Sequence, residues 1–134
     1  MGKKIIFTNG CFDIIHRGHL ELLRFCRSLG DEVIVGLNSD ESVQRLKGSN
    51  RPVVSQNDRK KLLEEFRCVD KVYIFEEDDP YKLLQCVQPD IIVKGGDYLS
   101  ENVIGSDLAE VVIFNTIDGY STTQIIDKSS LREN

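Results

Sequence analysis

Residues 4–19, KIIFTNGCFDIIHRGH, join an apolar, strand-like run to a short motif that contains both histidines of the chain. The apolar residues that follow recur at helical spacing: Leu20, Leu23, Cys26 and Leu29. The pattern predicts a strand, a turn and the start of a helix, with His16 and His19 in the first helical turn. That turn offers unpaired N–H groups and the positive end of the helix dipole, and Gly18 leaves room for close approach. The motif therefore predicts a phosphate site.

Other interpretations of the motif remain open. Two histidines three residues apart could form half of a metal site, with Cys11 and Asp13 as further ligands, or could serve structure alone. The strand–motif–helix context favours phosphate. Cys11 is a candidate nucleophile, but the chain has no further histidine to act as its base, so we interpret it as a space-filling residue.

Strand and helix signals alternate along the whole chain. Five runs are rich in valine and isoleucine and nearly continuous, as buried parallel strands are: Lys4–Thr8, Glu32–Leu37, Lys71–Phe75, Ile91–Lys94 and Val111–Asn115. Helical patterns separate them. The first covers about 18–29 with Gly30 as its stop, and a short one begins at Asp40.

Three further helices are expected. One begins at Ser55, with Asp58 completing a capping box, and buries Leu62, Leu63 and Phe66. Another begins at Asp79-Pro80, and a last one covers about 122–128. Strict β/α alternation predicts an α/β fold, a Rossmann-like doubly wound sheet of five parallel strands, in a single domain over residues 1–134.

Composition narrows the classes of function. A net charge of −5 speaks against nonspecific binding of nucleic acid or anionic membranes. No apolar run approaches the length of a membrane span and no signal peptide is evident, so a cytoplasmic location is expected. None of the four cysteines forms a CxxC pair, and Cys26 and Cys86 are expected to be buried as small hydrophobic residues in a reducing compartment.

Polar or glycine-rich segments follow four of the predicted strands: the histidine motif, NSDESVQRLKG at 38–48, KGGDY at 94–98 and DGYSTT at 118–123. In doubly wound sheets these segments meet at one edge, where ligands bind. The sequence has neither GxxxxGK[ST] nor GxGxxG, which disfavours a P-loop kinase and a dinucleotide-dependent dehydrogenase. A nucleotide site of another kind is predicted.

The segments GCFDIIHRGH, NSDESVQRLKGSNRPV, VKGGDY and DGYSTT resemble the HxGH nucleotidylyltransferase, or cytidylyltransferase-like, family. The resemblance is strongest to the nucleotidyltransferase domains that form ADP-heptose, and glycerol-3-phosphate cytidylyltransferases share the HxGH element. It implies an enzyme that transfers a nucleoside monophosphate from a triphosphate to a phosphorylated acceptor and releases pyrophosphate.

The resemblance also implies roles for individual residues. The implied catalytic residues are His16, His19 and Lys47. The implied nucleotide-binding residues are Thr8, Asn9, Gly10, Cys11, Phe12, Gly18, Lys94, Gly95, Asp97, Gly119, Ser121 and Thr122. The implied acceptor-binding residues are Asp13, Arg51 and Tyr98. No residue is assigned to a metal, because the sequence shows no dedicated carboxylate cage, but Mg²⁺ is expected with the triphosphate.

Plainer interpretations accompany several of these residues. Lys47 could be a solvated loop lysine, Ser121 and Thr122 a helix cap, and Gly95-Gly96 only a tight turn. Arg51 and Arg59 could pair with acidic neighbours rather than phosphate. The acidic run 76–79 is interpreted as a solvated cap region.

The resemblance implies ATP and D-glycero-manno-heptose 1-phosphate as substrates, because LKGSNRPV, VKGGDY and DGYSTT occur together and Thr116 stands where the cytidylyl pattern has arginine. The alternative is CTP with glycerol 3-phosphate or another small phosphorylated acceptor. An alternative of another class is a nucleotide-binding module without catalysis. The resemblance further implies a homodimer.

Overall fold

The valine- and isoleucine-rich runs form a single parallel sheet in the computed structural model, which describes residues 2–96 and 99–115. Its strands are β1 (Ile5–Gly10), β2 (Glu32–Asn38), β3 (Lys71–Phe75), β4 (Ile91–Gly95) and β5 (Glu110–Phe114). Their order is β3-β2-β1-β4-β5 and every pairing is parallel. The predicted α/β class and the five-stranded parallel sheet are confirmed.

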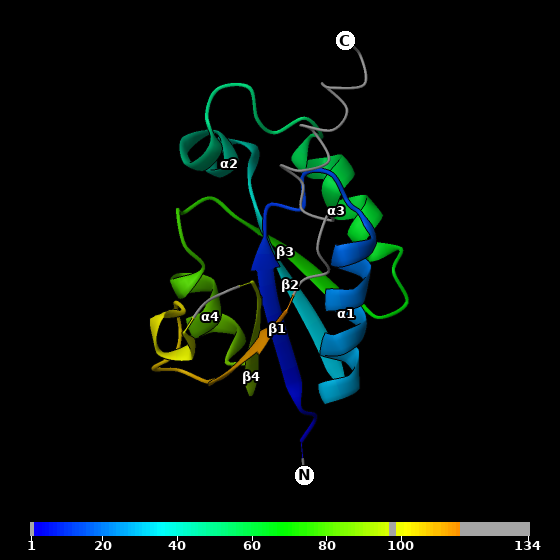
Figure 1. Ribbon diagram of the computed structural model, residues 1–134, viewed down its shortest axis with the longest axis vertical. Coiled ribbons are helices and arrows are strands. Elements are labelled where there is room, and N and C mark those ends of the chain that lie inside the picture. The colour runs from blue at the N-terminus through cyan, green and yellow to red at the C-terminus, as the bar shows by residue number, and fades with distance from the viewer. Residues whose placement is uncertain (1, 97–98, 116–134) are drawn as a thin grey trace.

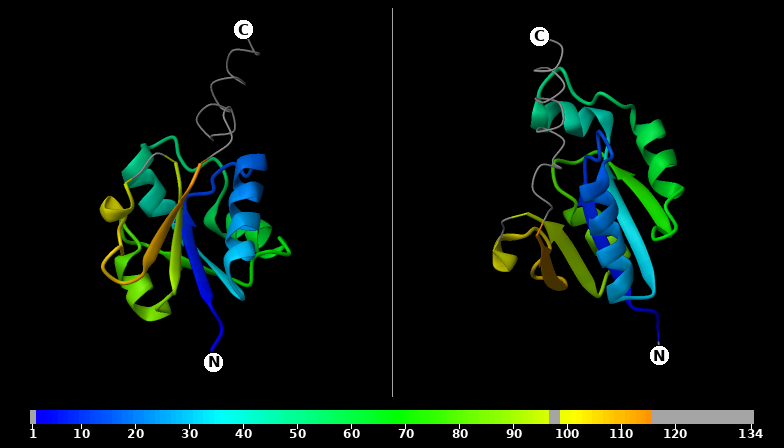
Figure 2. Two further views of the ribbon diagram at one scale, coloured as in Figure 1. Left: turned by 60° about the horizontal axis from the view of Figure 1, so that its bottom comes forward. Right: turned by 45° about the vertical axis from the view of Figure 1, so that its right-hand side comes forward.

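Helices cover both faces of this sheet (Figures 1 and 2). They are α1 (Arg17–Leu29), α2 (Asp40–Lys47), α3 (Gln56–Glu64) and α4 (Tyr81–Val87), with a 3₁₀ turn η1 (Ser100–Asn102) before β5. The left view of Figure 2 shows α1 and α4 on opposite sides of the strands. The last predicted helix, about 122–128, lies outside the described residues.

The hydrophobic core is divided by the sheet into two layers. On the side of α1 and α3, the buried residues Leu23 and Leu63 pack with Val35 and Val72 of the strands. On the other side, Leu84 of α4 packs with strand residues of β1, β2 and β4 and with Val103. Burial on both faces explains why the strands are continuously apolar rather than alternating.

Helix ends follow the sequence signals in part. Gly30 ends α1 as predicted. The N-cap residue of α4 is Pro80 rather than the predicted Asp79, although the Asp79 carboxylate accepts the N–H of Tyr81 at 2.9 Å. The helix α3 starts after Ser55, but the predicted capping box is wrong, because the Ser55 side chain makes no capping hydrogen bond. The start of α3 is held instead by Arg59, whose Nε donates to the carbonyl of Val54 at 2.8 Å.

Two predictions of burial are also wrong. Leu62 is 53% exposed, because Leu63 and Arg59, one helical turn apart, occupy the buried face of α3. Cys86 is exposed, because it borders an open groove between α4 and the strands β2 and β3. Cys26 is buried as expected.

Within residues 2–96 and 99–115, no helix is long and apolar enough to cross a membrane.

The strand order determines where a ligand can bind. From β1 the chain moves outward through β2 to β3, then crosses back and continues from β4 to β5. The order therefore reverses between β1 and β4, and the connections after these two strands diverge to opposite faces. Open α/β sheets bind ligands at this point, beyond the carboxyl ends of the strands.

Candidate active site

The histidine motif forms the turn between β1 and α1. After Gly10, Phe12 takes a left-handed backbone conformation with φ of 47°, which costs a residue other than glycine about 1–2 kcal/mol. The buried Phe12 ring holds this turn in place, since it packs into the core beside Leu23 and lies with its centroid 5.0 Å from that of His19. The turn therefore presents backbone and imidazoles, rather than the Phe12 side chain, to a ligand.

The side chains of His16 and His19 both accept backbone N–H groups at the start of α1. The N–H of Gly18 donates to Nδ1 of His16 at 3.1 Å, and the N–H of His16 donates to Nδ1 of His19 at 3.2 Å. The two ring centroids are 3.9 Å apart. A neutral imidazole that accepts at Nδ1 carries its proton on Nε2, so each ring presents an Nε2–H donor.

One N–H group that the sequence indicated as a phosphate donor is engaged within the turn. The sequence predicted that the backbone at Gly18 would face a phosphate, but its N–H is taken up by His16. The imidazoles, which the sequence also singled out, each accept a backbone N–H at Nδ1 and carry the proton on Nε2. A ligand role for Gly18 stays a prediction.

The protonation states of the two histidines are set by their surroundings. Burial lowers the pKa of His16. Burial, together with the charges of His16 and Lys47, lowers the pKa of His19 to about 3. Both rings are therefore neutral near pH 7 in the ligand-free protein. The positive charge of Lys47 near His19 favours the binding of an anion there.

Two lysines lie within electrostatic reach of this turn. Lys47 is the last residue of α2 and its side chain is exposed. Lys94 comes from β4, and its pKa is lowered by burial and by the charge of Lys47, while Cys11 acts in the opposite direction. The structure thus brings His16, His19, Lys47 and Lys94 from three different elements to the switch-point edge of the sheet.

Cys11 is half-buried in the same turn. Burial raises the pKa of its thiol, although the nearby charges of Lys47, Arg59 and Arg51 oppose the shift. The thiol is therefore protonated at neutral pH, which is the wrong state for a nucleophile.

Asp13 organises the site from within. Its carboxylate, only 1% exposed, accepts Nε of Arg51 at 2.6 Å and the N–H groups of Val53 and Val54 at 2.8 and 2.9 Å. Burial alone would raise the pKa of Asp13, but the two N–H groups and Arg51 hold it below its usual value. The expected acceptor contact of Asp13 and Arg51 stays a prediction, since in this structure the two residues bind each other and fix the segment before α3.

Arg59 pairs with an acidic residue, as one interpretation of the sequence allowed, and it also binds backbone carbonyls that the motifs did not indicate. Its side chain is fully buried, and its Nη1 donates to the carbonyls of Cys11 and Asn38 at 2.7 and 2.8 Å. Its Nη2 pairs with Asp40 at 2.7 Å. One guanidinium therefore joins the histidine turn, the end of β2, the start of α2 and the segment before α3. Its position one turn before the apolar Leu63 was the available signal that it faces inward.

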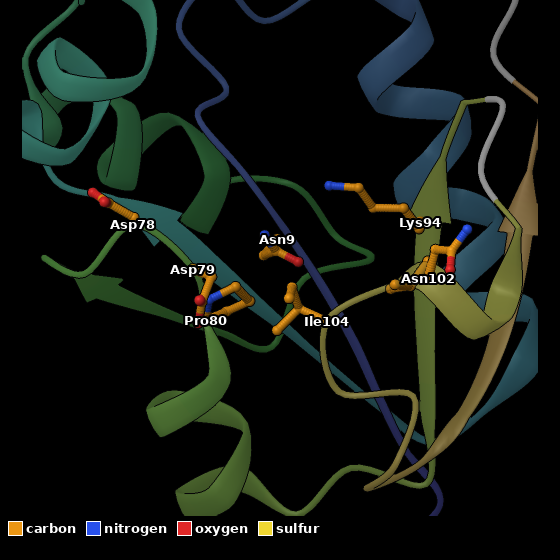
Figure 3. Close-up of a pocket in the computed structure, with 8 residues that line it drawn as sticks. Asn9, Asp78, Asp79, Pro80, Lys94, Asn102 and Ile104 are labelled. Atoms are coloured by element: carbon orange, nitrogen blue, oxygen red, sulfur yellow. The ribbon is translucent and has the colours of Figure 1, made fainter.

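A hollow of about 200 Å³ opens beside these residues at the switch point (Figure 3). It is lined by Asn9 of β1, Lys94 of β4, Asp78, Asp79 and Pro80 before α4, and residues 102–104. Asn9 and Lys94, two of the expected nucleotide-binding residues, therefore line the same hollow.

The other expected residues are placed as follows. Thr8 is buried, and its hydroxyl donates to the carbonyl of Val93 at 2.9 Å, so its side chain joins β1 to β4. Gly10 and Gly95 end their strands at the same edge of the sheet. The remaining expected residues lie outside the described residues: Asp97, Tyr98, Gly119, Ser121 and Thr122.

Comparisons with known proteins agree with this geometry. A family model described as cytidylyltransferase-like matches residues 7–134. The bifunctional protein HldE of Helicobacter pylori is 56% identical over 127 residues, which are 94% of this chain and 28% of that protein. HldE of a Nitratiruptor species is 55% identical over 95% of this chain and 28% of its own length. The chain thus spans a little over a quarter of the length of these curated relatives.

Solved structures show the same fold. A lipopolysaccharide core biosynthesis protein from Thermoplasma volcanium has a TM-score of 0.76 and 31% identity, and the alignment covers 87% of this chain and all of that one. Pantothenate synthetase from Thermus thermophilus shares only the fold, with a TM-score of 0.64 and 21% identity over 90% of this chain and 60% of that one. Because the family model covers the histidine turn and the sheet edge around it, the chain belongs to the cytidylyltransferase-like family.

Proposed function

We propose that the protein is a nucleotidyltransferase that moves a nucleoside monophosphate from a triphosphate onto a phosphorylated acceptor. The observation that carries this proposal is the pair of Nε2–H donors at His16 and His19, held by backbone hydrogen bonds at the switch-point edge of the sheet. Lys47 and Lys94 add positive charge to the same edge. Such an edge suits a substrate with several phosphates.

In the proposed reaction an oxygen of the acceptor's phosphate attacks the α-phosphorus of the triphosphate. A new P–O bond forms there, the bond from the α-phosphorus to the α,β-bridging oxygen breaks, and pyrophosphate leaves with the electron pair. The protein binds the two anions in line and stabilises the charge that develops on phosphate oxygens. His16 and His19 donate from Nε2 to those oxygens, and Lys47 neutralises the triphosphate from the end of α2.

We propose that Mg²⁺ accompanies the triphosphate and neutralises the leaving pyrophosphate. Among the described residues, no three His, Cys, Asp or Glu side chains are grouped closely enough to hold a metal ion. The Asp13 carboxylate is already engaged by Arg51 and two backbone N–H groups. The ion's oxygen ligands would then come mainly from phosphates and water, as is common for Mg²⁺.

The proposed substrates are ATP and D-glycero-manno-heptose 1-phosphate, giving ADP-heptose for polysaccharide synthesis. The similarity to HldE proteins and to a lipopolysaccharide core biosynthesis protein supports this choice. The family model, described as cytidylyltransferase-like, favours one alternative, CTP with glycerol 3-phosphate or another small acceptor.

A matrix of ATP, CTP, GTP and UTP against heptose 1-phosphate and glycerol 3-phosphate, read by pyrophosphate release, tests both assignments. Turnover mainly with ATP and the heptose supports the proposal. A strong preference for CTP with every acceptor would contradict the heptose assignment while leaving nucleotidyl transfer intact. Binding of nucleotide without turnover of any pair would instead indicate a non-catalytic module.

Nucleotide binding is expected to take up protons. The pKa of His19 is about 3 in the ligand-free protein, and a triphosphate beside the ring raises it, because negative charge stabilises the imidazolium. At a pH between the pKa of His19 in the free protein and its pKa in the complex, the complex binds a proton that the free protein lacks. The affinity for the triphosphate therefore falls as the pH rises through the pKa of His19 in the complex. Calorimetry at pH 6 in buffers of different ionisation enthalpy measures the uptake. Equal uptake in wild type and His19→Asn would contradict this account.

We propose, as the resemblance implies, that the protein is a cytoplasmic homodimer. Leu62 of α3 supports a contact there, since this large apolar side chain is 53% exposed on the segment between Lys61 and Val72. Light scattering at micromolar concentration is expected to give twice the mass of the 134-residue chain. A monomeric mass at that concentration would contradict the prediction.

A further inference from the structure

The helix α2 lies beyond the carboxyl end of β2 (Figures 1 and 2) and has little apolar surface to hold it there. Its buried residues are Ser42 and Val43, whereas Leu46 in its last turn is 50% exposed. A helix of eight residues is marginal without packing of an apolar face. The orientation of α2 therefore depends on its polar contacts.

Polar contacts hold the beginning and the middle of α2. The Asp40 carboxylate at its start pairs with Nη2 of Arg59 at 2.7 Å. In the middle, the Ser42 hydroxyl donates to the carbonyl of Glu77 at 2.8 Å. Both contacts lie more than one helical turn before Lys47, so they leave the last turn to be held by other groups.

Arg45 holds this last turn. Its Nε donates to the Asp78 carboxylate at 2.9 Å, and its Nη2 donates to the carbonyl of Glu76. Both acceptors belong to the segment between β3 and α4, and Asp78 is labelled in Figure 3. The acidic run 76–79, interpreted from the sequence as a solvated cap region, therefore also fixes α2. These two contacts are the Arg45 clamp.

The last turn matters because it carries Lys47. This lysine is the final residue of α2, and Gly48 after it has a φ of 107° where the chain leaves the helix. The charge of Lys47 acts on His19 of the histidine turn and on Lys94 of β4, so it belongs to the phosphate-binding edge. Because a lysine side chain is long and flexible, the place of its backbone limits which phosphate oxygens it reaches.

We propose that Arg45 is a positioning residue, which binds Asp78 and the Glu76 carbonyl and thereby holds Lys47 at the triphosphate. The proposal rests on the proposed function. Two of the three guanidinium nitrogens are taken up by the neighbouring segment, which favours action through Lys47 over direct binding of phosphate. Arg45 and Asp78 are at least half exposed, and exposed pairs contribute little to stability, so loss of the clamp loosens the turn and leaves the protein folded.

A double-mutant cycle tests whether Arg45 acts through Lys47. Arg45→Met is expected to lower kcat/KM for ATP about three- to fivefold, the most that an exposed ion pair shifts an equilibrium. In a Lys47→Ala background the same substitution is expected to cause no further fall, because the group that it positions is gone. Arg24→Met is the matched control. Arg24 pairs with Glu21 within α1 and is exposed, and its loss is expected to leave kcat/KM unchanged.

Asp78→Ala tests the clamp from its other side. If only the sum of charges mattered, removing this carboxylate would strengthen the binding of an anionic triphosphate. Loss of the clamp has the opposite sign, so kcat/KM for ATP is expected to fall, and Arg45→Met/Asp78→Ala is expected to be no worse than Arg45→Met. A rise in Asp78→Ala would overturn the proposal. So would an undiminished effect of Arg45→Met in Lys47→Ala, since Arg45 would then bind phosphate itself.

Hydrogen exchange of the Gly48 amide measures the last turn without activity. This N–H donates to the carbonyl of Gln44 at 2.9 Å, so its exchange rate reports whether the turn is formed. By NMR the rate is expected to rise about threefold in Arg45→Met and to stay unchanged in Arg24→Met. An unchanged rate in Arg45→Met would overturn the proposal. If wild type turns over no substrate pair, the proposed function fails, and the exchange rate decides separately whether Arg45 holds the turn.

Discussion

Replacing His16 or His19 by alanine is expected to lower kcat by about 10²–10³-fold, the usual effect of removing one donor to transition-state charge. Each ring presents an Nε2–H because its Nδ1 accepts a backbone N–H, and each is neutral at pH 7. Pyrophosphate release at saturating substrates measures the loss. Lys47→Ala is expected to act in the same direction.

His16 also caps α1, so alanine removes two functions at once. His16→Asn separates them, because an asparagine oxygen can accept the N–H of Gly18 but the imidazole is gone. This variant is expected to melt near wild type and yet to be as inactive as His16→Ala. Cys11→Ser is the control within the same turn and is expected to keep most activity. A fully active His16→Asn would contradict the catalytic role, and an inactive Cys11→Ser would contradict our interpretation of the thiol.

Arg59→Met is expected to destabilise the protein by about 3 kcal/mol or more, because it leaves three backbone carbonyls without their donor and each buried acceptor without a partner costs about 1–3 kcal/mol. The variant leaves the carbonyls of Cys11, Asn38 and Val54 without their donor and Asp40 without its cation. Methionine has a similar length, so the loss reports hydrogen bonds more than volume. Urea denaturation measures the free energy of unfolding.

Arg45→Met is the matched control for this measurement. Arg45 pairs with Asp78 across the surface, where both side chains are at least half exposed, and such pairs contribute about 1 kcal/mol at most. Equal losses in the two variants would contradict the view that Arg59 joins the loops of the site. Activity in Arg59→Met is expected to fall as well, because the histidine turn loses its anchor at the carbonyl of Cys11.

The sheet was predictable because each buried strand is a continuous apolar run and each helix repeats its apolar residues every three or four positions. The histidine turn was predictable because its residue types and its place between strand and helix coincide. The sequence predicted less well which side chains of α3 are buried. Both Leu62 and Leu63 are apolar, and only the packing of Leu63 into the core and of Arg59 against the loops decides which leucine faces water.

The roles of Asp13 and Arg59 depend on contacts between residues far apart in the sequence. Asp13 binds a segment about forty residues away, and Arg59 reaches the carbonyl of Cys11 across a similar separation. No local pattern encodes such contacts. The hollow was missed for the same reason, since it is assembled from β1, β4, the segment before α4 and residues 102–104.

We propose that the α-phosphorus of a triphosphate is transferred to a phosphorylated acceptor at the histidine turn. Phosphorus NMR of the reaction of ATP and Mg²⁺ with heptose 1-phosphate follows that atom directly. We expect a new diphosphate linkage that contains the α-phosphorus, together with pyrophosphate in equal amount, and neither signal with His16→Asn. Release of inorganic phosphate and ADP, or a product that retains the heptose phosphate unchanged, would contradict it.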